Sequence, residues 1–120
     1  MWTYYQSSGE LWHDNNYISR GYAGNGEGKN NPHMQDKENI GPLPQGTYTI
    51  GNSVKHPRLG PCAIPLLPAQ TNQMFGRAGF YIHGDSLSNP GTASEGCIIL
   101  SAPERMLIAS SPDRTLKVLP

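Results

Sequence analysis

Charge is scarce in this chain, and its two signs balance. Charged residues make up 15% of the 120 residues, with nine Lys and Arg against nine Asp and Glu. Since no cluster of basic side chains is available to follow a phosphate backbone, a nucleic-acid partner is not expected. No apolar run approaches the ~20 residues that cross a bilayer, so a membrane span is not expected either.

A conventional secretory signal is also missing from the sequence. Residues Met1–Gln6 offer neither a basic start nor an apolar segment. We therefore expect a protein that acts in the cytosol, or one that leaves the cell by a route that does not read such a signal.

Cysteine is equally rare. Cys62 lies in the apolar segment Gly60–Pro65, which is typical of a packed thiol, whereas Cys97 follows a run of small and polar residues. This contrast favours two separate thiols over one disulfide. Neither a Cys-x-x-Cys nor a His-x-x-x-His spacing occurs, so we expect no metal, and we expect no organic cofactor. No Gly-x-Ser-x-Gly elbow favours a serine nucleophile.

Glycine and proline are abundant instead, with 14 and 11 residues. They predict one turn-rich, mainly β domain over residues 1–120. Short apolar or alternating runs predict six to eight strands in a β-sandwich or open barrel. The strands are expected at Trp2–Gln6 and Leu11–Trp12 (a hairpin), Tyr17–Tyr22, Thr47–Ile50, Ala63–Leu67, Gly79–His83, Cys97–Leu100 and Leu116–Leu119. Prolines bracket Ala63–Leu67, which we therefore predict as an edge strand.

One helix is expected, from about Ala102 to Ser110. Ser101 and Glu104 have the spacing of a capping box, in which each side chain bonds the backbone N–H of the other residue. Pro103 is tolerated in the first turn. The polar segment from Gly24 to Asn39 is predicted as a surface loop, of a length typical of a binding loop or lid.

The residues with the clearest chemical potential are His83 and Cys97. A predicted strand delivers His83, a polar loop follows, and Cys97 opens the next strand. A cysteine attacks as its thiolate, and a nearby imidazole can accept the proton or hold the ion pair. The second ring nitrogen then needs an orienting partner, which is either a backbone carbonyl of the loop or Asp85. The other three histidines are predicted to be solvated loop residues: His13, His33 and His56.

Two small residues before the cysteine add to this interpretation. Gly96 lacks a Cβ, so a substrate carbonyl can approach the backbone, where the N–H of Cys97, with that of Gly96, would stabilise an oxyanion. Ser94 offers a hydroxyl to the same pocket or to the loop. Taken alone, these residues leave a structural or binding role open beside catalysis.

The motif itself resembles a known signature. Ile82-His83-Gly84, followed by Ser94-Glu95-Gly96-Cys97-Ile98, resembles the His-Gly and Ser-x-Gly-Cys motifs of L,D-transpeptidases. Nearly the whole chain is similar to the catalytic domain of type VI secretion L,D-transpeptidase effectors. The matching pieces include Gly21–Gly24, Gly41–Tyr48, Phe80–Asp85 and Ala93–Leu100.

The resemblance implies a set of site residues. The catalytic set comprises Cys97, His83, Ser94, Gly96 and Gly84, and the expected substrate-binding residues are Arg77, Asp85, Tyr22 and Tyr81. The general family pattern has a basic residue where Glu95 stands, and Arg or Asn where Ile99 stands. Arg77 is our candidate for the missing substrate-binding cation; its alternatives are a surface salt bridge or a loop anchor.

The resemblance also implies a function. The expected substrate is the tetrapeptide stem of peptidoglycan, cut as an L,D-carboxypeptidase or altered by exchange of its terminal D-alanine for another D-amino acid. Such an enzyme is expected to be a secreted antibacterial effector in the target-cell periplasm, with secretion components and an immunity protein as partners. Three alternatives stay open: a papain-like peptidoglycan amidase or endopeptidase, a non-catalytic wall-binding module, and an inactive relative that keeps the fold without turnover.

Overall fold

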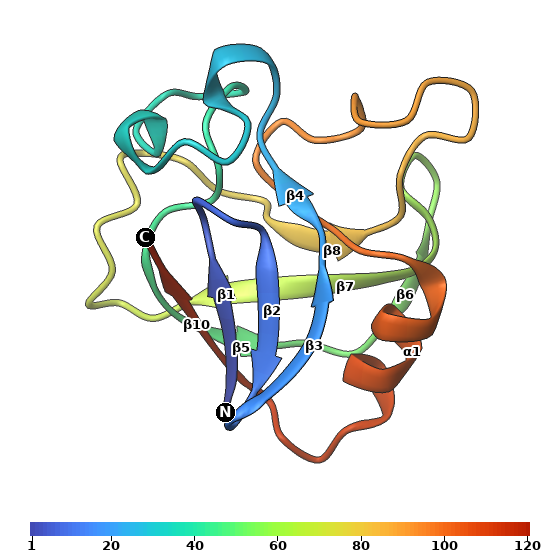
Figure 1. Ribbon diagram of the computed structural model, residues 1–120. Helices are drawn as coiled ribbons and strands as arrows, with labels where there is room; N and C mark the ends of the chain where they lie inside the picture. Colours follow the sequence, from blue (N-terminus) through green and yellow to red (C-terminus); the bar gives the residue numbers. More distant parts are fainter.

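Ten strands form one curled sheet that almost closes into a barrel (Figure 1). The structure is a computed structural model and describes residues 1–120. The strands are β1 (Trp2–Tyr5), β2 (Glu10–His13), β3 (Asn16–Arg20), β4 (Tyr22–Ala23), β5 (Gly46–Ile50), β6 (Val54–His56), β7 (Gly60–Pro68), β8 (Tyr81–His83), β9 (Ile98–Ile99) and β10 (Thr115–Leu119).

The mainly β prediction is confirmed, with ten strands in place of six to eight. Their order is β3-β2-β1-β10-β5-β7-β8-β9-β4, and β6 adds to β7. Four strands contain only two or three residues. Strands that short are too brief to show a pattern of alternating apolar and polar residues, so the sequence did not reveal them as separate strands.

The first and last strands lie together in the sheet. β1 pairs with β2 as the predicted hairpin and runs parallel to β10, with Tyr4 opposite Val118. Both residues are fully buried in one apolar core. That core contains Trp2, Tyr4, Leu11, Ala23, Leu43, Tyr48, Ile50, Ile64, Leu66, Phe80, Ile82, Ile98, Leu100, Ile108, Leu116 and Val118.

The predicted edge strand is a central one, so this prediction is wrong. The nine residues of β7 pair in turn with β6, β8 and β5. Different neighbours use different parts of the strand, and its prolines still serve as acceptors: the carbonyl of Pro65 takes the N–H of Gly51 at 2.8 Å. At Cys62 the backbone has a φ of 56°, and the pairing with β6 is irregular there.

The predicted helix is confirmed as α1 (Ala102–Ser110). Its start departs from a capping box, because Ser101 makes no side-chain bond to the helix backbone. The hydroxyls of Ser101 and Ser19 both donate to the carboxylate of Glu104, which ties the helix to β3. Neither α1 nor the 3-10 turns have the length and apolar character that a membrane crossing requires.

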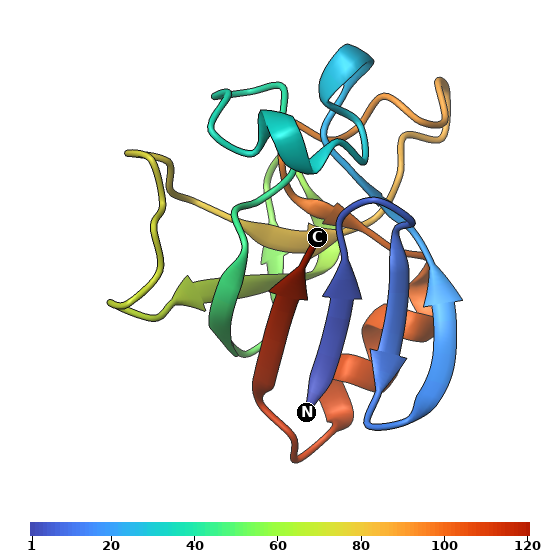
Figure 2. The same ribbon diagram turned by 60° about the vertical axis from the view of Figure 1, so that its left-hand side comes forward.

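Gly21 interrupts the strand predicted over Tyr17–Tyr22, so that β3 ends at Arg20 and β4 begins at Tyr22. Beyond β4, the predicted surface loop contains two 3-10 turns, η1 (Gly26–Gly28) and η2 (Pro32–Met34). Figure 2 shows this loop and the one between β8 and β9 rising from the same end of the barrel.

The two faces of β7 give a direct test of the core. Ile64 is fully buried, whereas 59% of Leu67 is exposed. Ile64→Ala leaves a cavity and should lower the free energy of unfolding by ~2–5 kcal/mol. Leu67→Ala on the same strand should change it by less than ~0.5 kcal/mol. Urea unfolding followed by tryptophan fluorescence measures both, and equal losses would contradict the described orientation of β7.

Candidate active site

One cleft of about 410 Å³ contains both predicted catalytic residues, Cys97 and His83. Four separate stretches of chain line it, around Glu38, Arg58, Phe80 and Glu95. It therefore draws on the loop after β4, the β6–β7 turn, the approach to β8 and the loop before β9.

Strand pairing explains why His83 and Cys97 share this cleft. β8 and β9 run parallel, with Ile82 opposite Ile98, both buried in the core. His83 ends β8, and Cys97 directly precedes β9. Because alternate residues of a strand face opposite sides, the residues flanking this buried pair face away from the core.

His83 has a defined tautomer. Its Nδ1 lies 2.9 Å from the carbonyl oxygen of Gly84, which can only accept, so Nδ1–H is the donor. In the neutral ring Nε2 then carries the free lone pair that a general base needs. Of the two orienting partners that the sequence left open, the structure has the backbone carbonyl.

Cys97 is half-buried and unbridged, and Cys62 is also free. This confirms two separate thiols, although Cys62 is only half-buried rather than packed. The Sγ of Cys97 accepts the backbone N–H of Tyr81 at 3.3 Å. The thiol and the imidazole of His83 share the cleft without a direct hydrogen bond; such contacts often tighten only when substrate binds.

The pKa directions of the two groups favour a neutral resting pair. Burial raises the pKa of the Cys97 thiol above its ordinary value of 9.0; the N–H of Tyr81 opposes this, and the carboxylate of Glu95 adds to it. Burial lowers the pKa of His83 below 6.5, although the Gly84 carbonyl opposes the change. At neutral pH the cleft therefore holds a thiol and a neutral imidazole, which is the arrangement for general-base activation.

Ser94 serves the loop rather than the open cleft. It is buried, and its Oγ accepts the N–H groups of Gly24 at 2.8 Å and Gly96 at 3.0 Å while donating to the carbonyl of Cys97 at 2.6 Å. These three bonds fix the backbone on both sides of Cys97. Since the Gly96 N–H is used here, it is not the second oxyanion donor that the sequence predicted.

Gly96 has a different reason to be glycine. Its φ is +143°, and a Cβ there would lie 2.6 Å from the Nη2 of Arg77 and 2.9 Å from the ring of Phe80. The space next to Gly96 is therefore filled by the protein, not reserved for a substrate carbonyl. The N–H of Cys97 takes no part in the side-chain or loop hydrogen bonds of this segment, so it is free to donate to an oxyanion.

Two of the predicted substrate-binding residues hold the loop after His83. The Tyr22 hydroxyl donates to Asp85 at 2.6 Å and accepts the N–H of Ala93, while the Asp85 carboxylate also accepts the N–H groups of Ser86 and Gly91. Neither side chain lines the cleft. Burial and this bond raise the pKa of Tyr22 to about 12.

Gly84 lies outside the cleft as well, and its Cα packs against the guanidinium of Arg105. Its carbonyl orients His83, so Gly84 contributes through its backbone. Of the four predicted substrate-binding residues, Tyr81 and Arg77 line the cleft. Only the side chain of Tyr81 makes no hydrogen bond to the rest of the protein.

Arg77 lines the cleft but is occupied as a loop anchor. It is buried, and its two terminal nitrogens donate to the carbonyls of Gln35, Gly41, Pro42 and Glu95 at 2.6–3.2 Å. With both nitrogens engaged, the fork that would grip a carboxylate is not available. The loop-anchor alternative therefore describes its contacts better than the predicted substrate cation.

The sequence missed two polar residues of the cleft wall, His56 and Arg58. His56 ends β6, and its ring meets the ring of Tyr81 edge-on, with centroids 5.3 Å apart. His13 is also no loop residue, because it ends β2 and stacks on Trp2. Of the three histidines predicted to be solvated loop residues, only His33 is exposed, and the other two are half-buried. No spacing in the sequence connects His56 to Cys97, so this proximity had no local signal.

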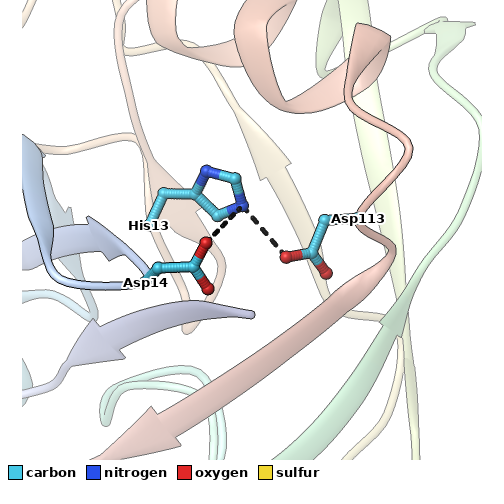
Figure 3. Close-up of side chains that lie close together, drawn as sticks. All are labelled: His13, Asp14 and Asp113. Atoms are coloured by element: carbon cyan, nitrogen blue, oxygen red, sulfur yellow. Dashed lines mark hydrogen bonds and ion pairs between the residues drawn. The ribbon is translucent and has the colours of Figure 1, made fainter.

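Possible metal-ligating side chains come together away from the cleft, at His13, Asp14 and Asp113 (Figure 3). The Nε2 of His13 lies 2.9 Å from the Asp113 carboxylate. The amino group of Met1 lies 2.5 Å from Asp113 and 2.8 Å from Asp14, and it is already the cation between these carboxylates. Chiefly through this amine, the pKa of Asp113 falls to about 2.

Comparison with known proteins gives one family. A family model described as the Tlde1 domain matches residues 18–118, which include every residue of the cleft. No curated protein matches the chain.

The neutral thiol makes a testable prediction for alkylation. In a Cys62→Ser background, the rate of Cys97 alkylation by iodoacetamide should still rise with pH above 9.0, because burial raises the pKa of this thiol. Glu95→Gln removes a carboxylate that raises this pKa and should move the profile to lower pH. A plateau reached near neutral pH would indicate a preformed ion pair and contradict the neutral resting state.

Proposed function

The chain belongs to the Tlde1 domain family, the type VI secretion L,D-transpeptidase effectors, and from this premise we propose that it is a cysteine enzyme of bacterial peptidoglycan. Its substrate is the tetrapeptide stem, and its reaction cleaves the bond before the terminal D-alanine. The observation that carries the proposal is the shared cleft of Cys97 and His83, with the Nδ1 of His83 bonded to the Gly84 carbonyl.

The first half of the reaction forms a thioester. Nε2 of His83 takes the proton of the Cys97 thiol as Sγ attacks the carbonyl carbon of the diaminopimelate residue. The tetrahedral oxyanion that forms accepts a hydrogen bond from the N–H of Cys97. When it collapses, the carbon–nitrogen bond breaks, and His83 returns the proton to the departing amine of D-alanine.

The second half releases the enzyme. Water, deprotonated by His83, attacks the thioester carbonyl, and the sulfur leaves and regains a proton, which gives L,D-carboxypeptidase activity. The amine of a free D-amino acid attacks in the same way and gives exchange. An amine on a second stem would give a cross-link. Tyr81 borders the reacting sulfur and contacts the substrate, whereas Ser94, Gly84 and Gly96 position the two reacting residues.

This chemistry suits an antibacterial effector. Loss or exchange of the terminal D-alanine removes the donor stems that cross-linking enzymes of the wall need, so the wall weakens. The place of action is then the periplasm of the target cell, reached through the type VI secretion machinery. An immunity protein that fills the cleft would be the expected partner.

Mass spectrometry of muropeptides tests the reaction. Wild-type protein should shorten tetrapeptide stems by one alanine residue, or exchange that residue when D-amino acids are supplied, and Cys97→Ala should do neither. His83→Gln should lower the rate by at least ~10²-fold, because the general base is lost. His33→Gln, the same substitution at an exposed histidine outside the cleft, is the matched control and should retain most of the rate.

The same experiment separates the alternatives. Products cut between sugars, or between L-alanine and D-glutamate, would contradict the proposed bond and support a different hydrolase. Unchanged muropeptides together with retained binding to the wall would support a non-catalytic module.

A further inference from the structure

The turn between β6 and β7 forms one wall of the cleft. β6 pairs with the start of β7, so that His56 lies opposite Gly60, and β7 in turn pairs with β8. Figure 1 shows β6 beside the first residues of the long β7. His56, Arg58 and Leu59 reach the same cleft as Cys97 and His83. This wall therefore comes within reach of any substrate group next to the scissile bond.

His56 presents a donor to this cleft. Its Nδ1 accepts the backbone N–H groups of Arg58 and Leu59, both at 3.1 Å. Because both partners can only donate, Nδ1 is unprotonated, and the proton of the neutral ring is on Nε2. The edge-on contact with Tyr81 holds the ring in place. No side chain or carbonyl of the protein accepts from Nε2, which leaves it for a ligand.

Arg58 is the cation of this wall, and its guanidinium is free. It is exposed and takes part in none of the ion pairs of the protein. The other four arginines are all engaged: Arg20 with Glu10, and Arg77, Arg105 and Arg114 with backbone carbonyls. Arg58 alone keeps an unused fork, the geometry that binds a carboxylate through two parallel hydrogen bonds.

We propose that His56 and Arg58 bind the terminal carboxylate of the stem peptide and so determine which bond Cys97 attacks. This inference rests on the proposed function. A terminal carboxylate lies one residue beyond the scissile carbonyl, about 3.8 Å along the chain from one Cα to the next. A group that recognises it must share the cleft with the nucleophile, as this turn does. A stem lengthened by one residue would displace its carboxylate from the turn.

Diaminopimelate has a side-chain carboxylate of the same chemistry, so the test must separate two sources. In a Cys97→Ala background, which prevents turnover, calorimetry measures binding of three peptides: the tetrapeptide, its C-terminal amide, and the tetrapeptide with lysine in place of diaminopimelate. Arg58→Gln should weaken binding of both free acids about tenfold or more and leave the amide unchanged. Arg58→Lys should lie between, because it keeps the charge without the fork.

His56→Asn separates the two nitrogens of the ring. An asparagine oxygen can replace Nδ1 as acceptor for the turn, so the turn is kept while the Nε2 donor is lost. This variant should weaken binding of the acid peptides and spare the amide. Lys55→Gln is the matched control, because Lys55 precedes His56 on β6 and does not line the cleft. This variant removes one positive charge, and it should leave the affinities for the acid peptides and for the amide unchanged.

Three results would overturn the inference. Equal losses for acid and amide would show a general effect on the cleft, and no loss in Arg58→Gln would show that the guanidinium is not used. A loss confined to peptides that contain diaminopimelate would identify the side-chain carboxylate as the ligand.

Turnover by the wild-type protein separates this inference from the proposed function. Acid-selective binding without any turnover would support the carboxylate site and contradict the proposed chemistry. Turnover of the tetrapeptide by an Arg58→Gln variant that still prefers acid to amide would support the chemistry and contradict the site.

Discussion

The parallel pairing of β8 with β9 is the constraint on which the rest of this site depends. Ile82 and Ile98 meet in the core, and this pair determines where the end of β8 and the start of β9 lie. His83 and Cys97 therefore reach one cleft although a loop of thirteen residues separates them. Parallel neighbours need a long crossover, and here that crossover contains no helix, so hydrogen bonds must hold it.

Those hydrogen bonds come from a few side chains, each with several partners. Ser94 fixes the backbone on both sides of Cys97, and Asp85 with Tyr22 fixes the first half of the loop. Arg77 binds four carbonyls and joins this loop to the one after β4. Buried arginine thus holds these loops through hydrogen bonds to their carbonyls. Arg58 is the one arginine whose guanidinium remains free for a ligand.

The sequence predicted the parts of the molecule that have a local signal. The helix from Ala102 and the strand that ends at His83 are of this kind, because apolar periodicity and turn residues are encoded within a few positions. The central place of β7 had no such signal, since its prolines are tolerated only because its neighbours change along its length.

The predictions for single polar side chains depended on tertiary structure that the sequence does not display. Arg77, Tyr22 and Asp85 have the residue types of a substrate site, yet all three bond within the protein. Arg77 and Tyr22 bond to backbone groups far away in sequence, and Asp85 bonds to Tyr22 and to the backbone of its own loop. His56 shows the reverse: it looked like a loop residue, and the β6–β7 turn brings it to the cleft. The group that orients His83 is likewise a backbone carbonyl, that of Gly84, which bonds the Nδ1 of the ring. The sequence could not distinguish it from Asp85.

Trapping the acyl-enzyme tests most directly whether the sulfur of Cys97 takes the acyl group. A stem analogue that ends in D-lactate carries an ester, which acylates a thiol faster than an amide does, so the intermediate should accumulate. After a rapid acid quench, intact-mass analysis should find one added tripeptide acyl group. Peptide mapping should place it on Cys97, with Cys62 unmodified. Release of D-lactate without any adduct on Cys97, or an adduct on another residue, would contradict the account.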